Sequence, residues 1–300
     1  NYWYTGTTLQ NPITKIRIVD SYTPTGAESE SWPAAVDTDK DGTLDDDIMC
    51  YITGTELTIA GNGSGGITAN ETSRYAFSAP TATSDKQFQK VTAIEGFDLL
   101  YTGNVTDMSY MFFNFGFSAT ALDLSDLENW NVSKVTNMSD MFCQTARYNK
   151  NFELDLSKWN VGNVTNMSNM FYNTGMSGSI NLDLSGWNTG NVTTMKHMFA
   201  GIGGFATTFE LNVTGWNIGN VTMNNMFYCA GNLSDTFEIK GLNTWNTGSV
   251  FDMTQMFEQA GYEATSWSIG DISNWNTGNV TTMKRMFYQA ATCAETFNIG

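Results

Sequence analysis

The sequence predicts an α/β solenoid in which each unit of about 29 residues carries one strand and one short helix, behind a β-rich N-terminal cap. Three observations predict this class. A Trp-Asn pair recurs along residues 101–300, alternating hydrophobic residues precede it, and a Val-x-x-Met-x-x-Met-Phe stretch follows it. Because a unit this small cannot bury its own hydrophobic face, neighbouring units are expected to stack.

The Trp-Asn pair sets the length of the unit. Six tryptophans open it: Trp130, Trp159, Trp187, Trp216, Trp245 and Trp275. Successive tryptophans lie 29, 28, 29, 29 and 30 residues apart, and the unit at Trp216 is one residue short before Met223. A seventh copy, which lacks the Trp, stands first: Val105, Met108, Met111 and Phe112.

Each half of the unit has its own hydrophobic period. Ile180, Leu182 and Leu184 alternate with polar residues, which predicts a half-buried strand. The Val, Met, Met and Phe of residues 164–171 fall at i, i+3, i+6 and i+7, which predicts one face of a short helix. We interpret the Met-Phe stripe as core packing rather than a cofactor site. The Asn after each Trp is expected to bond the backbone of the next coil.

The chain divides into two regions. Residues 1–100 lack the Met-Phe stripe and are expected to form a β-rich N-terminal cap or arm, with strands near 16–19, 50–52 and 57–59. Residues 101–300 are expected to form a seven-unit solenoid whose last coil is incomplete. Whether residues 1–48 are a separate small β domain or part of the cap stays open.

Composition excludes several classes of function. The chain has 14 Lys+Arg and 30 Asp+Glu, a net charge of -16, so its surface repels phosphate backbones and nucleic-acid binding is not expected. No apolar run approaches the length of a membrane span, so membrane insertion is not expected either. One His and four Cys leave few catalytic or metal-ligating combinations, so we expect no enzyme, free buried thiols, and a surface position for His197.

One stretch of the N-terminal region has the spacing of a calcium loop. Its expected ligands are Asp37, Asp39, Asp41, Thr43 and Asp45. Asp at positions 1, 3 and 5 with Gly42 at position 6 is the arrangement that folds carboxylates around Ca²⁺. The twelfth position is Ile48 instead of Glu, so a complete EF-hand is not expected. We predict a structural Ca²⁺ here, and a solvated acidic loop is the alternative.

Two further kinds of modification or contact site follow from the sequence. The candidate glycosylation sites are Asn62, Asn70 and Asn232, which lie in Asn-x-Ser/Thr sequons outside the repeated motif. The outward strand positions form rows that include Glu153, Asn181, Glu210 and Glu238. Like charges at one strand spacing repel, and Asn or Lys in alternate coils relieves this. These rows are either a solvated face or a binding face for a basic or cation-bridged partner.

Both ends of the chain suggest assembly. The last residues open like another strand and stop before a further Trp, which leaves an open strand edge. The candidate assembly residues are Tyr2, Trp3, Tyr4, Phe297 and Ile299. If these are natural ends, that edge would meet the first residues of the next molecule head to tail.

The repeated motif resembles a known family. Trp-Asn-Thr-Gly-Asn-Val-Thr-Thr-Met-Lys-x-Met-Phe, at 187–199 and again at 275–287, resembles the BspA-like bacterial surface-protein leucine-rich repeat, which is also found in mycoplasma surface lipoproteins. The resemblance covers about residues 101–300. It implies a leucine-rich-repeat-type solenoid, secretion or surface display, and adhesion or protein contacts instead of catalysis. The loop at 37–47 similarly resembles the calcium loops of dockerin and thrombospondin type 3 repeats.

Two functions of different classes follow. The first is a secreted, non-enzymatic structural protein that assembles with itself head to tail into an extracellular filament or surface layer. The alternative is a cell-surface adhesin that binds a host or matrix protein through its exposed strand face. Both place the chain outside the cell or on its surface.

Overall fold

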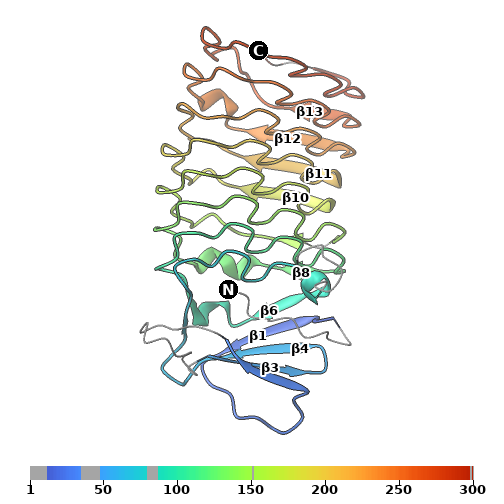
Figure 1. Ribbon diagram of the computed structural model, residues 1–300. Coiled ribbons are helices and arrows are strands. Elements are labelled where there is room, and N and C mark those ends of the chain that lie inside the picture. The colour runs from blue at the N-terminus through green and yellow to red at the C-terminus, as the bar shows by residue number, and fades with distance from the viewer. Residues whose placement is uncertain (1–11, 35–47, 80–86, 151, 298, 300) are drawn as a thin grey trace.

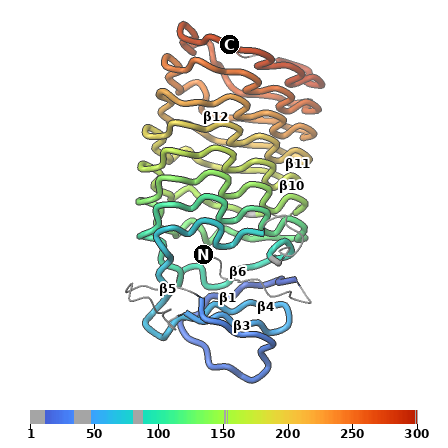
Figure 2. The backbone as a smooth tube through the Cα atoms, viewed as in Figure 1, coloured from blue at the N-terminus to red at the C-terminus, as the bar shows by residue number. Residues whose placement is uncertain are grey.

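The computed structural model describes residues 12–34, 48–79, 87–150, 152–297 and 299, and these form an elongated stack of coils above a small sheet (Figures 1 and 2). The strands are β1 (Lys15–Val19), β2 (Glu30–Pro33), β3 (Met49–Thr53), β4 (Glu56–Ala60), β5 (Ile67–Thr68), β6 (Ala93–Glu95), β7 (Leu100–Tyr101), β8 (Leu122–Asp123), β9 (Phe152–Glu153), β10 (Ser177–Asp183), β11 (Phe205–Asn212), β12 (Thr236–Lys240) and β13 (Ser266–Ser268). The short 3₁₀ helices are η1 (Gln87–Lys90), η2 (Phe97–Leu99), η3 (Ser125–Asn129) and η4 (Leu242–Thr244).

The N-terminal sheet has the strand order β2-β3-β4-β1-β6. The strands predicted near 16–19, 50–52 and 57–59 are confirmed as β1, β3 and β4. β2, β3 and β4 pair antiparallel, whereas β1 pairs parallel with both β4 and β6. The sheet therefore changes from antiparallel to parallel on the side from which β6 leads into the coils (Figure 1).

A second sheet runs along one side of the stack. β10, β11, β12 and β13 pair parallel in that order, each strand coming from the next coil. Like residues face like residues, so that Phe209 lies opposite Phe237, and Phe237 opposite Trp267. Inward side chains such as Leu182 and Leu211 are buried. The alternating segments are thus strands, as their period of two predicts.

The predicted α/β class, with a leucine-rich-repeat unit of one strand plus one short helix, is wrong. No α-helix occurs among the described residues. The Val-x-x-Met-x-x-Met-Phe stretches are successions of turns joined by isolated parallel bridges, for example Asn137 to Asn166. In the stretch that ends at Phe142, Asp140 has a φ of 56°, and just beyond it Gln144 has a φ of 58°. A right-handed helix cannot contain left-handed residues at this spacing.

The hydrogen bonds of these turns explain the helix-like spacing. The backbone N–H groups of Met138, Asp140 and Phe142 donate to carbonyls of the next coil at 2.9 Å. Between them, Met141 and Cys143 donate three residues back within their own coil, at 3.3 and 3.1 Å. An α-helix would instead donate four residues back. The N–H groups thus bond alternately to the next coil and within their own coil. This arrangement satisfies the backbone and still leaves the Met and Phe side chains facing inward.

The core is a set of columns that run the length of the stack. One column of stacked phenylalanine rings contains Phe77, Phe112, Phe142, Phe171, Phe199, Phe227, Phe257 and Phe287. Neighbouring ring centroids in it lie 5.1 to 5.6 Å apart. Each such contact contributes about 0.5–1.5 kcal/mol beyond the burial of its area. The interpretation of the Met-Phe stripe as core is confirmed, since Met138 and Met141 are fully buried beside this column.

A coil of the same construction precedes the first repeat found in the sequence. Tyr75 has a φ of 62°, the Phe77 N–H donates to the Met111 carbonyl at 2.8 Å, and the Phe77 ring stacks on Phe112. Residues 73–79 thus occupy the place of a Met-x-x-Met-Phe stretch, with Ser73 and Ala76 in the methionine positions. The stack extends under the repeats by this coil.

Each unit has two asparagines with different hydrogen bonds, whereas the sequence led us to expect that the Asn after Trp would bond the neighbouring coil. Asn160, which follows Trp159, accepts the Gly162 N–H of its own coil at 3.2 Å. Asn163 instead donates through Nδ2 to the Ser133 carbonyl of the preceding coil at 2.6 Å. The side-chain bond between coils therefore comes from the Asn before Val, and the Asn after Trp closes a local turn.

Candidate binding surface

Two rows of side chains project outward from the sheet β10–β13. The first row contains Asn181, Glu210, Glu238 and Ser268, and the second contains Asp183, Asn212 and Lys240. Their alignment follows from the in-register pairing of the strands, as predicted from the sequence. β9, which carries Glu153, pairs with β8 in a different sheet, so the strand pairing of β10–β13 does not extend to it.

One lysine forms ion pairs with two carboxylates in these rows. Lys240 Nζ pairs with Glu210 Oε1 and lies 3.4 Å from Glu238 Oε2. The hydrogen bond to Glu210 raises the pKa of Lys240 above its usual value. The predicted relief of repulsion by a lysine in an adjacent coil is confirmed at this position.

Two aspartates at the end of the strand face are held in fixed positions. The Ser157 N–H lies 2.9 Å from Asp155 Oδ1 and lowers the pKa of that carboxyl. The Ser185 N–H does the same for Asp183, also at 2.9 Å. The charge of Asp155 partly opposes this lowering of the Asp183 pKa, because the two like charges lie in adjacent coils. Both carboxylates are therefore ionised at neutral pH and repel one another.

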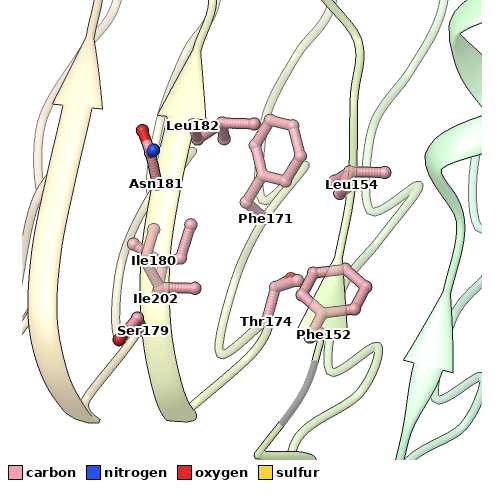
Figure 3. A pocket seen from close by; sticks show the side chains of 9 residues that line it. All are labelled: Phe152, Leu154, Phe171, Thr174, Ser179, Ile180, Asn181, Leu182 and Ile202. Carbon is pink, nitrogen blue, oxygen red and sulfur yellow. The ribbon is translucent and has the colours of Figure 1, made fainter.

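The face is interrupted by a seam between β9 and β10, which belong to different sheets. Figure 3 shows the side chains that line a pocket there: Phe152, Leu154, Phe171, Thr174, Ser179, Ile180, Asn181, Leu182 and Ile202. The pocket is open to solvent, and the volume of about 320 Å³ assigned to it includes that open space. Phe152 and Leu154 on one side are half-buried, and Ile180 and Leu182 on the other are buried.

The backbone of β10 is irregular where the seam begins. The pairing of β10 with β11 shifts register between Gly178 and Ser179. Gly178 has a φ of 95°, and a Cβ there would lie 2.4 Å from the Lys150 carbonyl oxygen, so only glycine allows this approach of the two coils. A register shift of this kind redirects the following side chains. The pocket is thus built by the backbone and is not a chance gap between side chains.

Apolar side chains also lie exposed at the corner that leads into the strands. Tyr148 is 54% exposed, Phe205 53% and Leu233 37%. Arg147 lies 5.8 Å from the ring centroids of both Phe117 and Tyr148. Phe205 is the first residue of β11, and Tyr148 and Leu233 lie in the segments that lead into β9 and β12.

The predicted calcium ligands Asp37, Asp39, Asp41, Thr43 and Asp45 lie outside the described residues. The segment that carries them connects β2 to β3, and its ends are tied by a hydrogen bond from the Ala34 N–H to the Ile48 carbonyl at 2.8 Å. The flanking elements are therefore strands, as expected for a loop that is not an EF-hand. Ile48, at the twelfth position, is buried in the core.

The three glycosylation candidates differ in how free their amides are. Asn62 is exposed, and its Oδ1 accepts the Ser64 N–H at 3.1 Å. Asn70 is half-buried. Asn232 donates through Nδ2 to the Gln259 carbonyl at 3.0 Å, so a glycan on that nitrogen would disturb a bond between coils.

The assembly candidates Tyr2, Trp3 and Tyr4 lie outside the described residues. Phe297 continues a second aromatic column, with its ring centroid 4.9 Å from that of Trp267. The Ile299 carbonyl accepts the Ile272 N–H at 2.9 Å. Both residues thus extend the ladders of the coil before them.

The remaining reactive groups are dispersed or internally paired. Glu258, almost fully buried, bonds Arg285 Nη2 at 2.5 Å and Gln255 Nε2 at 2.8 Å. His197 occupies a left-handed position, with a φ of 55°, and is half-buried, so it is less solvated than expected. Desolvation by this burial lowers its pKa, and the charge of Lys196 adds to the effect.

The cysteines are free, as predicted. Cys50 and Cys143 are buried, Cys229 is half-buried and Cys293 is exposed, so the expected burial holds for only part of the set. Within the described ranges, no three His, Cys, Asp or Glu side chains gather closely enough to hold a metal ion. No helix in those ranges has the length and hydropathy needed to span a bilayer.

These features define a repeat protein whose coils are joined by parallel strands and bridges and which presents a polar strand face with one apolar seam. The chain belongs to the family described as Mycoplasma protein of unknown function, DUF285, whose model matches residues 82–207, 108–238 and 203–299. The three overlapping matches follow the repeated coils. No curated protein and no solved structure matches the chain.

Proposed function

We propose that the chain is a non-enzymatic surface protein that binds a host or matrix protein through the outward face of the sheet β10–β13. The observation that carries the proposal is the register of that sheet, which places side chains such as Asn181, Glu210 and Glu238 at one strand spacing in successive coils. A rigid array of this kind suits recognition of an extended partner, as in other stacked-repeat proteins.

Charge favours a basic partner. The net charge of the chain is -16, and the face of β10–β13 carries Asp183, Glu210 and Glu238, with Asp155 across the seam beside it. Complementary charge accelerates association and selects among partners more than it adds to affinity. We therefore propose a partner with a positively charged surface, and binding that weakens as salt rises.

Display outside the cell is part of the proposal. It is supported by the resemblance of the motif at 187–199 and 275–287 to the repeat of BspA-like bacterial surface proteins and by membership of a mycoplasma family. We propose no catalytic function, because the strand face presents side chains suited to contact and the buried Glu258 is already neutralised by Arg285.

The test uses the whole chain and immobilised matrix proteins that carry basic surface patches, measured by surface plasmon resonance. The variant Glu210→Gln with Glu238→Gln removes two charges from the face and is expected to slow association about threefold to tenfold at low salt. The control Glu71→Gln with Glu263→Gln removes two exposed charges from other parts of the chain. Equal binding by both variants and the unmodified chain would contradict the proposal.

The second candidate is head-to-tail assembly into a filament or surface layer. It is favoured by the exposure of apolar side chains in the coil after Trp275, where Met283 is 42% exposed and Phe297 49%. The equivalent methionine of the preceding coil, Met253, is fully buried. A further coil would cover this surface, whether it belonged to the same chain or to a second molecule.

Sedimentation of the chain at rising concentration, followed by electron microscopy, separates the two candidates. If copies stack, the sedimentation coefficient rises with concentration and Met283→Lys abolishes the rise. A lysine at another exposed apolar position, Phe251→Lys, serves as the control. A coefficient independent of concentration would exclude assembly of this chain with itself.

A further inference from the structure

We propose that the seam between β9 and β10 binds one aliphatic side chain from an extended, basic segment of a partner protein, and that a Lys or Arg of that segment lies between Asp155 and Asp183. This inference rests on the proposed function, because it names the anchor point within the same face. The argument has three steps, which concern the walls of the pocket, its mouth and the charges beside it.

The walls of the pocket favour an apolar occupant. Phe152 and Leu154 on one coil face Ile180 and Leu182 on the next, and Phe171 lies between them (Figure 3). The pocket is a shallow opening in the surface and not an enclosed cavity, since the volume of about 320 Å³ assigned to it includes open solvent. Half-buried apolar side chains at the surface gain free energy when an aliphatic group displaces water from them. Burial of one such side chain improves affinity about tenfold to a hundredfold.

The polar groups of the pocket give no reason to expect a polar ligand. The Thr174 hydroxyl donates to the Phe142 carbonyl at 2.6 Å and is fully buried. The Ser179 hydroxyl shares a hydrogen bond with the Thr207 hydroxyl at 3.2 Å. Asn181 is exposed at the mouth and can hydrogen-bond a peptide group. An apolar side chain carried by a peptide backbone satisfies this combination.

The charges beside the seam select a basic segment. Asp155 directly follows Leu154, and Asp183 directly follows Leu182, so each carboxylate lies one residue beyond a pocket wall. The two carboxylates lie close enough to repel across the seam, since the charge of Asp155 acts to raise the pKa of Asp183. A cation placed between them relieves this repulsion and adds two ion pairs. The expected occupant therefore carries Lys or Arg within one or two residues of its aliphatic side chain.

The experiment observes methyl groups of the full chain by NMR, with isotope labels on Ile and Leu. The probe is the peptide acetyl-Ser-Lys-Leu-Lys-Ser-amide, compared with versions in which Leu is replaced by Ser or both Lys by Glu. We expect shifts of the methyl signals of Leu154, Ile180, Leu182 and Ile202 with the first peptide. Each replacement is expected to weaken binding, by about tenfold or more for Leu to Ser.

Two sets of variants keep the inference falsifiable. Ser179→Phe fills the mouth of the pocket, and Ser266→Phe places the same ring at the matching register position of β13, away from the seam.

The second set tests the charges. Asp155→Asn with Asp183→Asn removes both charges but keeps an acceptor for the serine N–H groups, and is expected to weaken binding about fivefold at low salt. Asp271→Asn is its control, because Asp271 accepts the Ser273 N–H at 2.8 Å in the same way.

The outcomes separate this inference from the proposed function. Loss of binding in Ser179→Phe, with binding intact in Ser266→Phe, supports the seam. Shifts confined to methyl groups of β11 and β12 overturn the seam but leave the strand face as the binding surface. If an uncharged leucine derivative binds as well as the peptide, charge plays no part in binding. That outcome overturns the proposed role of Asp155 and Asp183 and also leaves the strand face as the binding surface. Absence of any shift overturns the seam and leaves the proposed function to the matrix-protein assay.

Discussion

The indole Nε1 of Trp159 donates a hydrogen bond to the carbonyl oxygen of Leu127, 2.7 Å away in the preceding coil. The same ring stacks on Trp187 of the following coil, with centroids 6.5 Å apart and planes 3° from parallel. Each tryptophan of the repeat thus joins the coil before it by a hydrogen bond and, along most of the column, the coil after it by its face. This double use explains why the repeat carries Trp and no other aromatic residue at that position.

Replacing Trp159 by Phe tests this role. The ring face is retained in part, but the buried Leu127 carbonyl loses the indole N–H and keeps only the Trp130 backbone N–H, at 3.0 Å. Loss of one hydrogen bond to an acceptor that keeps another costs about 0.5–1.5 kcal/mol, and the smaller ring leaves additional empty space. We expect Trp159→Phe to lose about 1–3 kcal/mol of the free energy of unfolding, measured by urea denaturation with circular dichroism.

Trp275→Phe is the control for position in the stack. Trp275 donates to the Leu242 carbonyl at 2.8 Å but is 9% exposed, so water reaches this coil more easily. Its substitution is expected to cost less than that of Trp159. Equal losses at the two positions would show that packing of the ring, and not the buried hydrogen bond, determines the effect.

The glycine that follows the Trp-Asn pair provides a second test. At Gly190 an added Cβ would lie 3.3 Å from both Asn188 Oδ1 and Asn217 Nδ2. At Gly219, the matching position of the short unit, it would meet no atom within 4 Å. Neither backbone is left-handed. At both sites Ala therefore restricts the unfolded chain, which by itself stabilises the folded state by about 0.4–1 kcal/mol. At Gly190 the close contacts of the added Cβ oppose this gain.

We therefore expect Gly219→Ala to stabilise the chain slightly and Gly190→Ala to destabilise it, with a difference of about 1 kcal/mol between them. The measurement is the urea midpoint of each variant. If both variants were equally stable, the side chains of Asn188 and Asn217 would move aside freely. Their fixed positions would then contribute nothing to stability.

The strands could be predicted because their signal is local and has no competitor. Alternation at Ile180, Leu182 and Leu184 fits a strand and no other element, and parallel pairing then fixes which residues align. The buried methionines were also predictable, because a repeated apolar residue in a stacked unit must face the core. The strands and the buried positions of the methionines could therefore be predicted from the residues alone.

The helix prediction was wrong because two backbone structures place i, i+3, i+6 and i+7 on one side. The distinguishing signal was present in the residues at the left-handed positions, which include Asp140, Asn169, His197 and Asn225. Asn, Asp and His tolerate this conformation better than other residues with a side chain. The pattern of apolar residues alone ignores them, since they are polar side chains, three of them half-buried and Asn225 buried.

The seam could not be predicted from the repeat. It depends on the approach of Gly178 to the Lys150 carbonyl and on the register shift beside it, and neither is encoded in the spacing of hydrophobic residues. The coil at 73–79 was missed for another reason, because Ser73 and Ala76 replace both methionines and remove the motif while the hydrogen bonds persist.

The two ion pairs of Lys240 predict a salt-dependent effect. Lys240→Gln leaves Glu210 and Glu238 in adjacent strands without a cation between them. We expect a lower melting temperature at low ionic strength, and a smaller difference from the unmodified chain at about 1 M salt, where surface charges are screened. Lys158→Gln, which removes one pair with Glu128 at 3.0 Å, is expected to have a smaller effect.

Glu28 predicts a pH effect in the N-terminal region. The Tyr22 hydroxyl at 2.6 Å, and then the Thr25 N–H at 2.8 Å, lower the pKa of Glu28 from 4.5 to about 2. A lowered pKa in the folded state stabilises the fold above the unfolded-state pKa, and this stabilisation is lost as pH falls toward 2. Glu28→Gln should therefore be less stable than the unmodified chain above pH 4.5, and the difference should shrink between 4.5 and 2.

The carboxyl carbon signal of Glu28 in an NMR titration checks this directly. Its inflection is expected near pH 2, while in Tyr22→Phe it is expected to move toward 4.5, because the largest cause of the lowering is removed. An inflection near 4.5 in the unmodified chain would contradict the hydrogen bonds that hold this loop.

The loop at residues 37–47 predicts calcium binding that stabilises the N-terminal sheet. The loop joins β2 to β3, and the Ala34–Ile48 hydrogen bond holds its ends together, so a bound ion would tie down a hairpin that is already closed at its base. Single loops of extracellular modules bind with Kd of about 10⁻⁴–10⁻³ M. At a tenfold excess over Kd, which is about 1–10 mM Ca²⁺, binding stabilises the folded chain by about 1.4 kcal/mol.

We therefore expect the melting temperature to rise with millimolar Ca²⁺ and to fall on chelation, with heat of binding for one ion in calorimetry. Asp39→Asn should abolish both effects, because position 3 of the loop supplies a carboxylate ligand. Asp46→Asn removes the same charge outside the predicted ligand set and should bind as the unmodified chain does. If the two variants behaved alike, the loop would be a solvated acidic segment whose charge, and not its geometry, attracts cations.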